Sequence, residues 1–277
     1  MNVGIIGRGF VGDAVYQNLD HTLAYDIEPS RSDVESIEEL CNKCKFIYVC
    51  LPTPMNSDGS SNVRIIESAL EEANRYATDR NIFILKSTVP PGTSRKILLG
   101  KPNIQMVFSP EFLTEANYIL DFKNCNRVIF GGPESLADRC VSFAKETFPN
   151  KEYITTDFET AEMIKYFINN FLTVKVAFAN EMKQVCDATA ISYDDVKNIA
   201  LLDKRIGPSH LSVPGPDGEL GFGGTCFPKD INAMITYSTN KGVDCKILRS
   251  AWTKNLDIRE NKDWLTMYGR AVVEPEE

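Results

Sequence analysis

The chain has 277 residues, of which 43% are hydrophobic, and carries 30 Lys and Arg against 38 Asp and Glu, a formal net charge of -8. This length suffices for one large or two ordinary domains with a sizeable core. The acidic balance and the lack of a Lys/Arg-rich run argue against a nucleic-acid partner. Because no apolar stretch reaches the roughly 18 residues of a membrane span and no signal sequence opens the chain, we expect a soluble, cytoplasmic protein.

The first half of the sequence alternates apolar strands with helices. Residues 2–7 are typical of a buried parallel strand, and the glycine-rich segment 7–12 opens a helix to about Leu19. A helix is also expected over residues 62–78. Further strands are predicted at residues 22–25, 46–51, 82–85, 105–108 and 127–130. This alternation predicts a Rossmann-like, doubly wound parallel sheet, which we assign to residues 1–156 as an NAD-binding domain.

The pattern changes near Asp157, where one long helix to about Thr189 is expected. Asp157 and Thr160 form a possible capping box at its start, and apolar residues recur at helical spacing. Shorter helices are predicted at residues 193–201, 229–241 and 245–268, with a loop rich in Gly and Pro at 207–224. We therefore predict an α/β protein whose second domain, residues 157–277, is all-helical. We expect this domain to bind substrate and to form a dimer.

The eight cysteines are scattered, which indicates reduced thiols and not a disulfide framework. Cys41 and Cys44 form a lone C-x-x-C, open to interpretation as a redox pair or as half of a metal site. No second C-x-x-C follows, and the sequence has only the histidines His21 and His210. We therefore favour two structural thiols on a helix face before a strand, and we predict no metal.

The segment G-R-G-F-V-G fits the dinucleotide-binding motif G-x-G-x-x-G. Gly7 permits a tight turn, Gly9 lets the backbone approach a pyrophosphate, and Gly12 allows close packing of the helix on the strand. The N-terminus of the helix offers N–H groups to phosphates. Asp26 ends the next strand, where its carboxylate can accept hydrogen bonds from the ribose hydroxyls. The same carboxylate would repel a 2′-phosphate, which favours NAD over NADP. The alternative is a glycine-rich turn without a ligand, and Arg31 either flanks the adenosine or is a solvated charge.

Four further segments are harder to explain as packing. They are K-S-T-V-P-P-G-T at 86–93, S-P-E-F-L-T-E at 109–115, A-E-M-I-K-Y-F-I-N-N at 161–170 and G-F-G-G-T-C-F-P-K-D at 221–230. Together with Pro52-Thr53-Pro54 and Arg205-Ile206-Gly207, they resemble, in order, the motif series of the UDP-glucose/GDP-mannose dehydrogenase family. The resemblance runs from residue 3 to about residue 235, and the cysteine-bearing segment is its most specific part.

The resemblance implies a four-electron oxidation in polysaccharide biosynthesis. The primary alcohol of a nucleotide-sugar, UDP-glucose above all, becomes the acid while two NAD are reduced. Cys226 lies in a glycine-rich loop, from which a thiolate can attack an aldehyde to give a thiohemiacetal; hydride loss then gives a thioester that water cleaves. The alternative for Cys226 is a buried structural thiol.

Lys165 and Asn169 are four residues apart, so they share one face of the long helix, among apolar neighbours. The resemblance implies that they stabilise the oxyanions of the reaction. The alternative is a salt-bridged lysine at the helix surface.

The resemblance also gives roles to residues of the other motifs. It makes Glu111 the general base, acting directly or through water, and has Asp230 organise Lys165 and a water. The residues expected to bind the cofactor are Gly7, Gly9, Phe10, Val11, Gly12, Asp26, Arg31, Thr53, Pro54, Ser87, Thr88 and Glu115. Of these, Thr88 and Glu115 are expected to face the nicotinamide, and Thr88 is also expected to be catalytic. The residues expected to contact the substrate are Glu111, Phe112, Leu113, Lys165, Asn169, Phe222, Gly223 and Arg205, the last reaching the sugar of a neighbouring subunit in a homodimer.

Two departures from the family pattern stand out. The loop Pro214-Gly215-Pro216-Asp217-Gly218-Glu219-Leu220 is longer than usual, and no residues resemble the family's third domain, which binds the uridine end. We expect a natural short form, an enzyme for a smaller substrate, or part of a longer protein. Other interpretations are a two-electron hydroxyacid dehydrogenase of the 6-phosphogluconate or 3-hydroxyisobutyrate type, which needs no Cys226, and a non-catalytic NAD-binding subunit.

Overall fold

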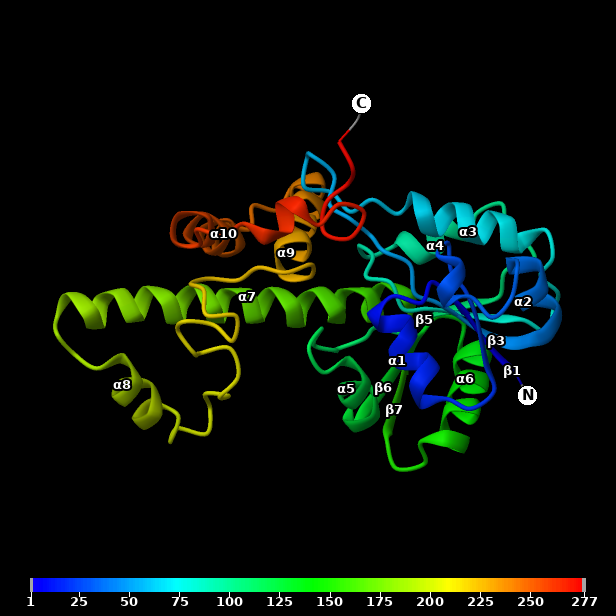
Figure 1. Cartoon of the computed structure of the whole chain (residues 1–277), viewed down its shortest axis with the longest axis horizontal. Helices are drawn as coiled ribbons and strands as arrows, with labels where there is room; N and C mark the ends of the chain where they lie inside the picture. Colours follow the sequence, from blue (N-terminus) through cyan, green and yellow to red (C-terminus); the bar gives the residue numbers. More distant parts are fainter. Residues whose placement is uncertain (1, 276–277) are drawn as a thin grey trace. The chain divides into compact units, whose positions relative to one another are not determined.

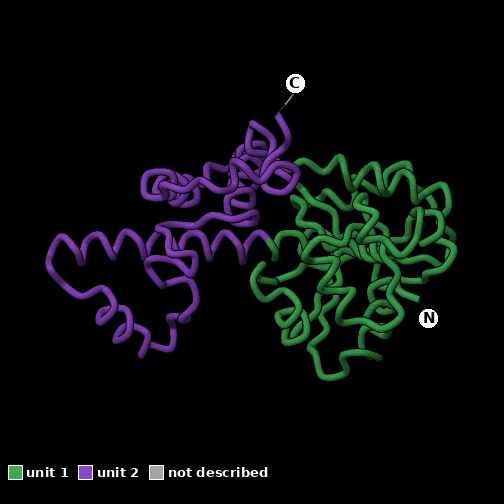
Figure 2. The backbone as a smooth tube through the Cα atoms, viewed as in Figure 1, with its two compact units in different colours: residues 1–53, 62–165 green, residues 54–61, 166–277 purple. Residues whose placement is uncertain are grey.

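The computed structural model of the chain describes residues 2–275. Contacts within the chain divide it into two compact units, which Figure 2 shows in different colours. Unit 1 comprises Met1–Thr53 and Asn62–Lys165, and unit 2 comprises Pro54–Ser61 and Tyr166–Glu277. The second unit is therefore built from two separate pieces of the sequence.

Within residues 2–275, unit 1 contains a seven-stranded sheet of order β2-β1-β3-β4-β5-β6-β7. Its strands are β1 (Asn2–Ile6), β2 (Thr22–Tyr25), β3 (Cys44–Val49), β4 (Ile82–Leu85), β5 (Met106–Phe108), β6 (Arg127–Gly131) and β7 (Glu152–Thr156). The predicted Rossmann-like class is confirmed, but the sheet is not wholly parallel, because β5 and β6 pair antiparallel through Phe108 and Gly131. The strand order reverses between β1 and β3, and ligands of such sheets bind beyond the carboxyl ends of the strands at this point.

Helices cover both faces of this sheet (Figure 1). They are α1 (Phe10–Asn18), α2 (Ile37–Lys43), α3 (Arg64–Asn74), α4 (Thr93–Ile97), α5 (Tyr118–Asn124) and α6 (Glu134–Thr147), with a 3₁₀ turn, η1, at Pro29–Arg31. Alternate residues of β3 enter different apolar clusters: Ile47 packs with α2 and α3, while Phe46 packs with α1 and α6. Because both faces are buried, these strands read as continuous apolar runs.

The long predicted helix is confirmed as α7 (Phe158–Ala188), with 31 residues. Asp157 caps it, since its Oδ1 accepts the Thr160 N–H at 2.8 Å and its Oδ2 accepts the Thr160 hydroxyl at 2.7 Å. The first turns of α7 belong to unit 1 and the remainder to unit 2. Residues on this one helix are therefore shared between the two units.

Unit 2 adds α8 (Tyr193–Ala200), α9 (Phe227–Asn240), α10 (Lys246–Ile258) and a 3₁₀ turn, η2 (Asp263–Thr266). The expected single helix over 245–268 is wrong, because α10 ends at Ile258 and the chain turns before η2. The apolar core of this unit contains Ala177, Phe222, Ile231, Ile235 and Ala251. No helix among residues 2–275 combines the length and the hydropathy that crossing a membrane requires.

The segment Pro54–Ser61 pairs with the end of unit 2. The Met55 N–H donates to the Ala271 carbonyl at 2.8 Å, and the Val273 N–H donates to the Met55 carbonyl at 3.0 Å. The Thr236 hydroxyl of α9 also donates to the Asp58 carbonyl at 3.1 Å. These bonds explain why a segment that follows β3 groups with the helical unit.

Candidate active site

The glycine-rich turn between β1 and α1 has the geometry that its sequence predicts. Gly7 has φ +88°, and a Cβ atom there would lie 2.8 Å from the Cys50 carbonyl oxygen. A Cβ atom on Gly12 would lie 2.0 Å from the Gly7 carbonyl oxygen, so only glycine lets α1 pack this closely. At Gly9 no atom lies within 4 Å of the corresponding position. The turn therefore has an open side, next to the N-terminus of α1, that fits a pyrophosphate.

Asp26 follows β2 and lies beside this turn. Its Oδ2 accepts the Arg8 N–H at 2.6 Å, and its Oδ1 accepts the Glu28 N–H at 2.9 Å. These bonds hold the carboxylate against the glycine-rich turn, where a ribose would follow the pyrophosphate. Arg31 lies in η1 and is exposed. The residues present thus fit a dinucleotide without a 2′-phosphate.

Polar side chains gather where β3 and β4 end. The Thr53 hydroxyl donates to the Thr88 carbonyl at 2.9 Å, and the Leu51 N–H donates to the Ser87 hydroxyl at 2.9 Å. Glu162 of α7 holds the next turn, since its carboxylate accepts the N–H groups of Gly92 at 2.6 Å and Ser94 at 2.8 Å. Glu162 is a structural residue that the sequence interpretation did not single out.

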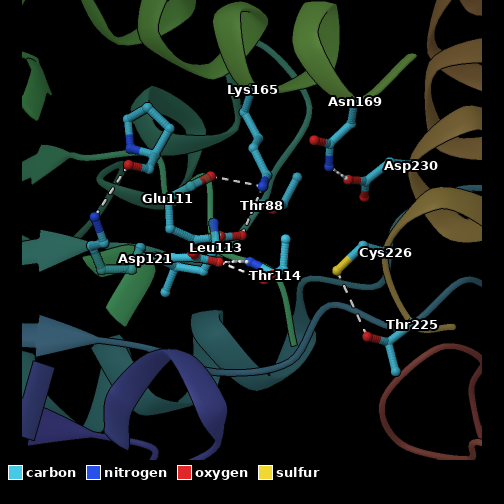
Figure 3. A network of polar contacts seen from close by, with 12 residues as sticks. Thr88, Glu111, Leu113, Thr114, Asp121, Lys165, Asn169, Thr225, Cys226 and Asp230 are labelled. Carbon is cyan, nitrogen blue, oxygen red and sulfur yellow. Dashed lines mark hydrogen bonds and ion pairs between the residues drawn. The ribbon is translucent and has the colours of Figure 1, made fainter. Parts of the chain in front are cut away.

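Lys165 and Glu111 form a buried ion pair in unit 1 (Figure 3). The Lys165 Nζ atom lies 2.7 Å from Oε1 of Glu111 and 2.7 Å from its carbonyl oxygen. The exposed fractions of the two residues are 3% and 6%, which removes the alternative of a lysine at the helix surface. Burial alone would raise the pKa of the Glu111 carboxyl, but Lys165 and the Leu113 N–H outweigh it and hold that pKa below its usual range.

Lys86 is a buried cation next to this pair that the sequence interpretation missed. Its Nζ atom donates to the Ser109 hydroxyl at 3.3 Å and to the Pro110 carbonyl at 3.2 Å, just before Glu111 in the chain. Burial lowers the pKa of Lys86 to about 8, against the opposing effects of Cys50 and Glu111. The available signal was a lysine directly after a wholly apolar strand.

Asn169 and Asp230 form a second buried contact, in unit 2 (Figure 3). Asn169 Nδ2 donates to Asp230 Oδ2 at 2.6 Å, and Lys229 Nζ lies 2.5 Å from Asp230 Oδ1. Asp230 is 1% exposed and Asn169 is 6% exposed. Because Asn169 follows Lys165 by one turn of α7, this helix carries one member of each pair.

Cys226 lies at the N-cap of α9. It is half-buried, and its Sγ atom is 3.7 Å from the Thr225 hydroxyl (Figure 3). The preceding glycines Gly221 and Gly224 have φ angles of +69° and +72°. The thiol thus follows a loop that only glycine can form, at a helix end where N–H groups are available to a ligand oxygen.

The remaining predicted residues differ in exposure. Phe222 is 4% exposed and packs edge-on against Phe227, so its side chain supports the loop. Phe112 and Leu113 are half-buried and Glu115 is exposed. The Arg205 guanidinium is exposed and binds Asp203, with Nη2 2.5 Å from Oδ2. By contrast, the lone C-x-x-C is buried, and burial raises the pKa of Cys41 to about 12 and that of Cys44 to about 11, as suits structural thiols.

A glycine-rich dinucleotide turn on a Rossmann-like sheet, followed by a helical unit, defines the class of dinucleotide-dependent dehydrogenases. Two family models match the chain in sequence order. Residues 15–148 match the NAD binding domain of the UDP-glucose/GDP-mannose dehydrogenase family, and residues 159–257 match its central domain. The chain belongs to this family, and NAD is the cofactor of its first domain.

Relatives and solved structures agree with this assignment. A UDP-glucose 6-dehydrogenase of Rickettsia prowazekii is 33% identical over 245 residues, which are 86% of this chain and 55% of that protein. A UDP-glucose 6-dehydrogenase of Rickettsia felis is 31% identical over 86% of this chain and 53% of its own length. The chain therefore spans about half the length of these curated relatives.

Among solved structures, a UDP-glucose dehydrogenase from Pyrobaculum islandicum superposes with a TM-score of 0.80 at 26% identity, covering 92% of this chain and 68% of the other. A 3-hydroxyisobutyrate dehydrogenase from Mycobacterium tuberculosis has a TM-score of 0.72 at 16% identity and covers 91% of both chains. The second likeness shows only that the fold is shared.

Proposed function

We propose that this chain oxidises the primary alcohol of a nucleotide-sugar, UDP-glucose above all, to the acid in two NAD-dependent steps. The observation that carries the proposal is the set of side chains Lys165, Asn169, Glu111, Asp230 and Cys226. Four of these side chains are polar, nearly fully buried and paired. Burying such pairs costs free energy, and apolar side chains of the same size are often equally stabilising, so their presence supports a role beyond packing. The reaction is proposed from the family to which the chain belongs, and the role of each side chain is proposed from its chemistry and its contacts.

Bound NAD accepts a hydride from the carbon that is oxidised. In the first step the alcohol gives its proton to water and its oxygen becomes negative. The Lys165 ammonium, which lies 2.7 Å from the Glu111 carboxylate, and the Asn169 amide stabilise this oxygen. Asp230, which accepts from Asn169 Nδ2 at 2.6 Å, fixes the orientation of that amide. The product of this step is an aldehyde.

In the second step the Cys226 thiolate attacks the aldehyde carbon and forms a thiohemiacetal. Loss of a second hydride from this carbon leaves a thioester. Glu111 then removes a proton from water, which attacks the thioester carbon, releases the acid and returns the thiol. One alcohol, one water and two NAD⁺ thus give one acid, two NADH and two protons, one released by the alcohol and one by the Cys226 thiol.

We also propose that the active form is a homodimer assembled through α7. The aromatic side chains Phe167, Phe171 and Phe178 of this helix are 71%, 59% and 60% exposed, and Val185 is 50% exposed. Their spacing of four, seven and seven residues places them on one helix face. A contiguous apolar stripe of this kind supports a protein interface.

The test is NADH formation by the purified protein with NAD and a panel of nucleotide-sugars, counted per molecule of sugar consumed. Two NADH per UDP-glucose, or per another nucleotide-sugar, is the expected result. One NADH, or turnover of small hydroxyacids alone, would instead place the protein with the two-electron dehydrogenases. NAD binding without NADH on any substrate would overturn the proposed activity.

A further inference from the structure

The backbone of the loop before Cys226 is held by side chains from other parts of unit 2. Asn255 of α10 binds Phe222 in both directions: its Oδ1 accepts the Phe222 N–H at 2.7 Å, and its Nδ2 donates to the Phe222 carbonyl at 2.9 Å. Asn180 of α7 accepts the Gly221 N–H at 3.2 Å. Asn255 is fully buried and Asn180 is 3% exposed. The loop therefore takes its hydrogen bonds from side-chain amides in the interior.

The next part of the loop is held by charged groups. Asp263 of η2 accepts the Gly224 N–H through Oδ2 at 3.0 Å. Its Oδ1 lies 3.4 Å from Nη2 of Arg259, a residue that is only 2% exposed. A Cβ atom on Gly223 would lie 2.3 Å from Arg259 Nη2 and from Asp263 Oδ1, so the loop backbone rests directly on this ion pair.

Arg259 also reaches residues 214–220, the loop that we expect from the sequence to be longer than usual. Its Nη2 lies 2.9 Å from Asp217 Oδ2, and its Nη1 donates to the Leu220 carbonyl at 3.4 Å. Residues 214–220 are thereby tied to the same guanidinium that binds Asp263. Arg259 thus joins residues 214–220 to the loop that precedes Cys226.

The buried Asn255 amide and the buried Arg259 guanidinium are unusual choices for residues that only fill space. A buried amide and a buried guanidinium cost free energy unless all their bonds are made, and an apolar core is often equally stable. Here the bonds converge on residues 221–224, and Gly224 lies two residues before Cys226. The backbone that leads to Cys226 is therefore held by these side chains.

We propose that Asn255, Arg259 and Asp263 are positioning residues for Cys226, and that Asp217 holds Arg259 from residues 214–220. This inference rests on the proposed function, in which Cys226 acts only in the second oxidation. Thiolate attack needs the sulfur about 3–3.5 Å from the aldehyde carbon, and a displacement of about 1 Å costs up to about a hundredfold in rate. Loosening the loop should therefore slow the second oxidation selectively.

The test variant is Asn255→Leu, which keeps the number and branching of the side-chain heavy atoms and removes both bonds to Phe222. In single-turnover experiments with protein in excess over UDP-glucose, we expect the first NADH to form within about threefold of the wild-type rate and the second at least about tenfold more slowly. Asn240→Leu, on the exposed end of α9, is the matched control. Equal slowing of both phases would show a purely structural role and overturn the proposal.

A second measurement does not depend on turnover. Alkylation by iodoacetamide is followed for each cysteine by peptide mass spectrometry, with Cys125 and Cys245, also half-buried, as internal references. In Asp263→Asn, and in Asn255→Leu if it folds, Cys226 should react about threefold faster or more because its loop opens more often. A changed Cys226 rate in a protein that makes no NADH would keep the positioning role and overturn the proposed function. An unchanged Cys226 rate would overturn the positioning role.

Discussion

Lys165 and Glu111 are joined at two points: the Lys165 Nζ atom lies 2.7 Å from both the side-chain Oε1 and the main-chain oxygen of Glu111. Removing one partner of a buried pair leaves the other charge uncompensated. Lys165→Met should therefore lower the free energy of unfolding by about 3–5 kcal/mol, measured by urea denaturation. Lys183→Met, which breaks an exposed pair with Asp187 on the same helix, should cost about 1 kcal/mol or less.

The same variant should change the response to acid. Because the pKa of Glu111 is lowered in the folded protein, its ionised form stabilises the fold above the carboxyl's unfolded pKa of about 4.3, and this contribution is lost as the pH falls through the lowered value. Without Lys165, burial dominates and the pKa of Glu111 should rise. As the pH falls through this raised pKa, folded Lys165→Met takes up a proton that the unfolded chain does not yet hold, so its stability should rise while that of the wild type does not. The stability gap between the two proteins should therefore narrow on acidification, and a gap that stays constant with pH would contradict this account.

Lys86 should give the protein an alkaline dependence of stability. Its pKa is lowered to about 8 from 10.5, so between these values the unfolded chain holds a proton that the folded chain has released. Stability therefore rises with pH in this window, and the wild type should gain about 3 kcal/mol relative to Lys86→Met between pH 8 and 10.5. Denaturation at several pH values measures this difference, and Lys96→Met on the exposed face of α4 should show no such trend.

Asp26 should contribute to NAD binding through ribose hydroxyls. Losing these hydrogen bonds in Asp26→Ala costs about 1–3 kcal/mol, which raises the Kd for NAD about 5- to 150-fold. Calorimetric titration measures the change. Asp20→Ala, an exposed acidic residue between α1 and β2, is the control and should bind NAD like the wild type. Equal affinities of the Asp26 variant and the wild type would contradict the assigned role.

Cys226→Ser should separate the two oxidations. The hydroxyl is a far weaker nucleophile than the thiolate, so acid formation should cease while the first NADH can still form. Single-turnover absorbance at the NADH band, with product analysis, measures both phases. Cys245→Ser, at the start of α10, should keep both phases. An unchanged steady-state rate in Cys226→Ser would remove the thioester mechanism.

The exposed stripe on α7 should determine the oligomeric state. The wild type is expected at twice the 31.0 kDa mass of the chain in light scattering, and Phe171→Asp with Phe178→Asp should give monomers. Leu99→Asp, which is 74% exposed in unit 1, should leave the dimer intact. A monomeric wild type at micromolar concentration would be the contrary result.

Much of the fold follows from local patterns. The buried strands are short apolar runs, and α7 repeats its apolar residues at helical spacing behind an Asp157 cap, so both were predictable. The direction of a strand is not encoded in an apolar run, which is why the antiparallel pairing of Phe108 with Gly131 was missed. Lys165, Asn169, Cys226, Glu111 and Asp230 were recognisable by their motifs. Which of them contact each other is fixed by tertiary structure, as in the pairs Lys165–Glu111 and Asn169–Asp230.

The residues around the Cys226 loop show the same limit. Asn255, Arg259 and Asp263 are spaced by four, as on one face of a solvated helix, and all three lie within the single helix that was expected over residues 245–268. In the structure they surround a loop more than thirty residues earlier, and the helix ends at Ile258. Polar spacing alone does not distinguish a helix face in water from one buried against backbone.

The grouping of Pro54–Ser61 with the helical unit has a practical meaning for dissecting the protein. The polypeptide passes between its two units three times, so neither unit is one uninterrupted stretch of sequence. A fragment that stops before α7 would keep Met55 but lose Ala271 and Val273, its main-chain partners. The helical half, expressed alone, would lack the two main-chain hydrogen bonds that Met55 supplies. Truncation of the gene before α7 would therefore damage both halves. A circularly permuted or co-expressed version would have to keep the eight residues Pro54–Ser61 with the helices.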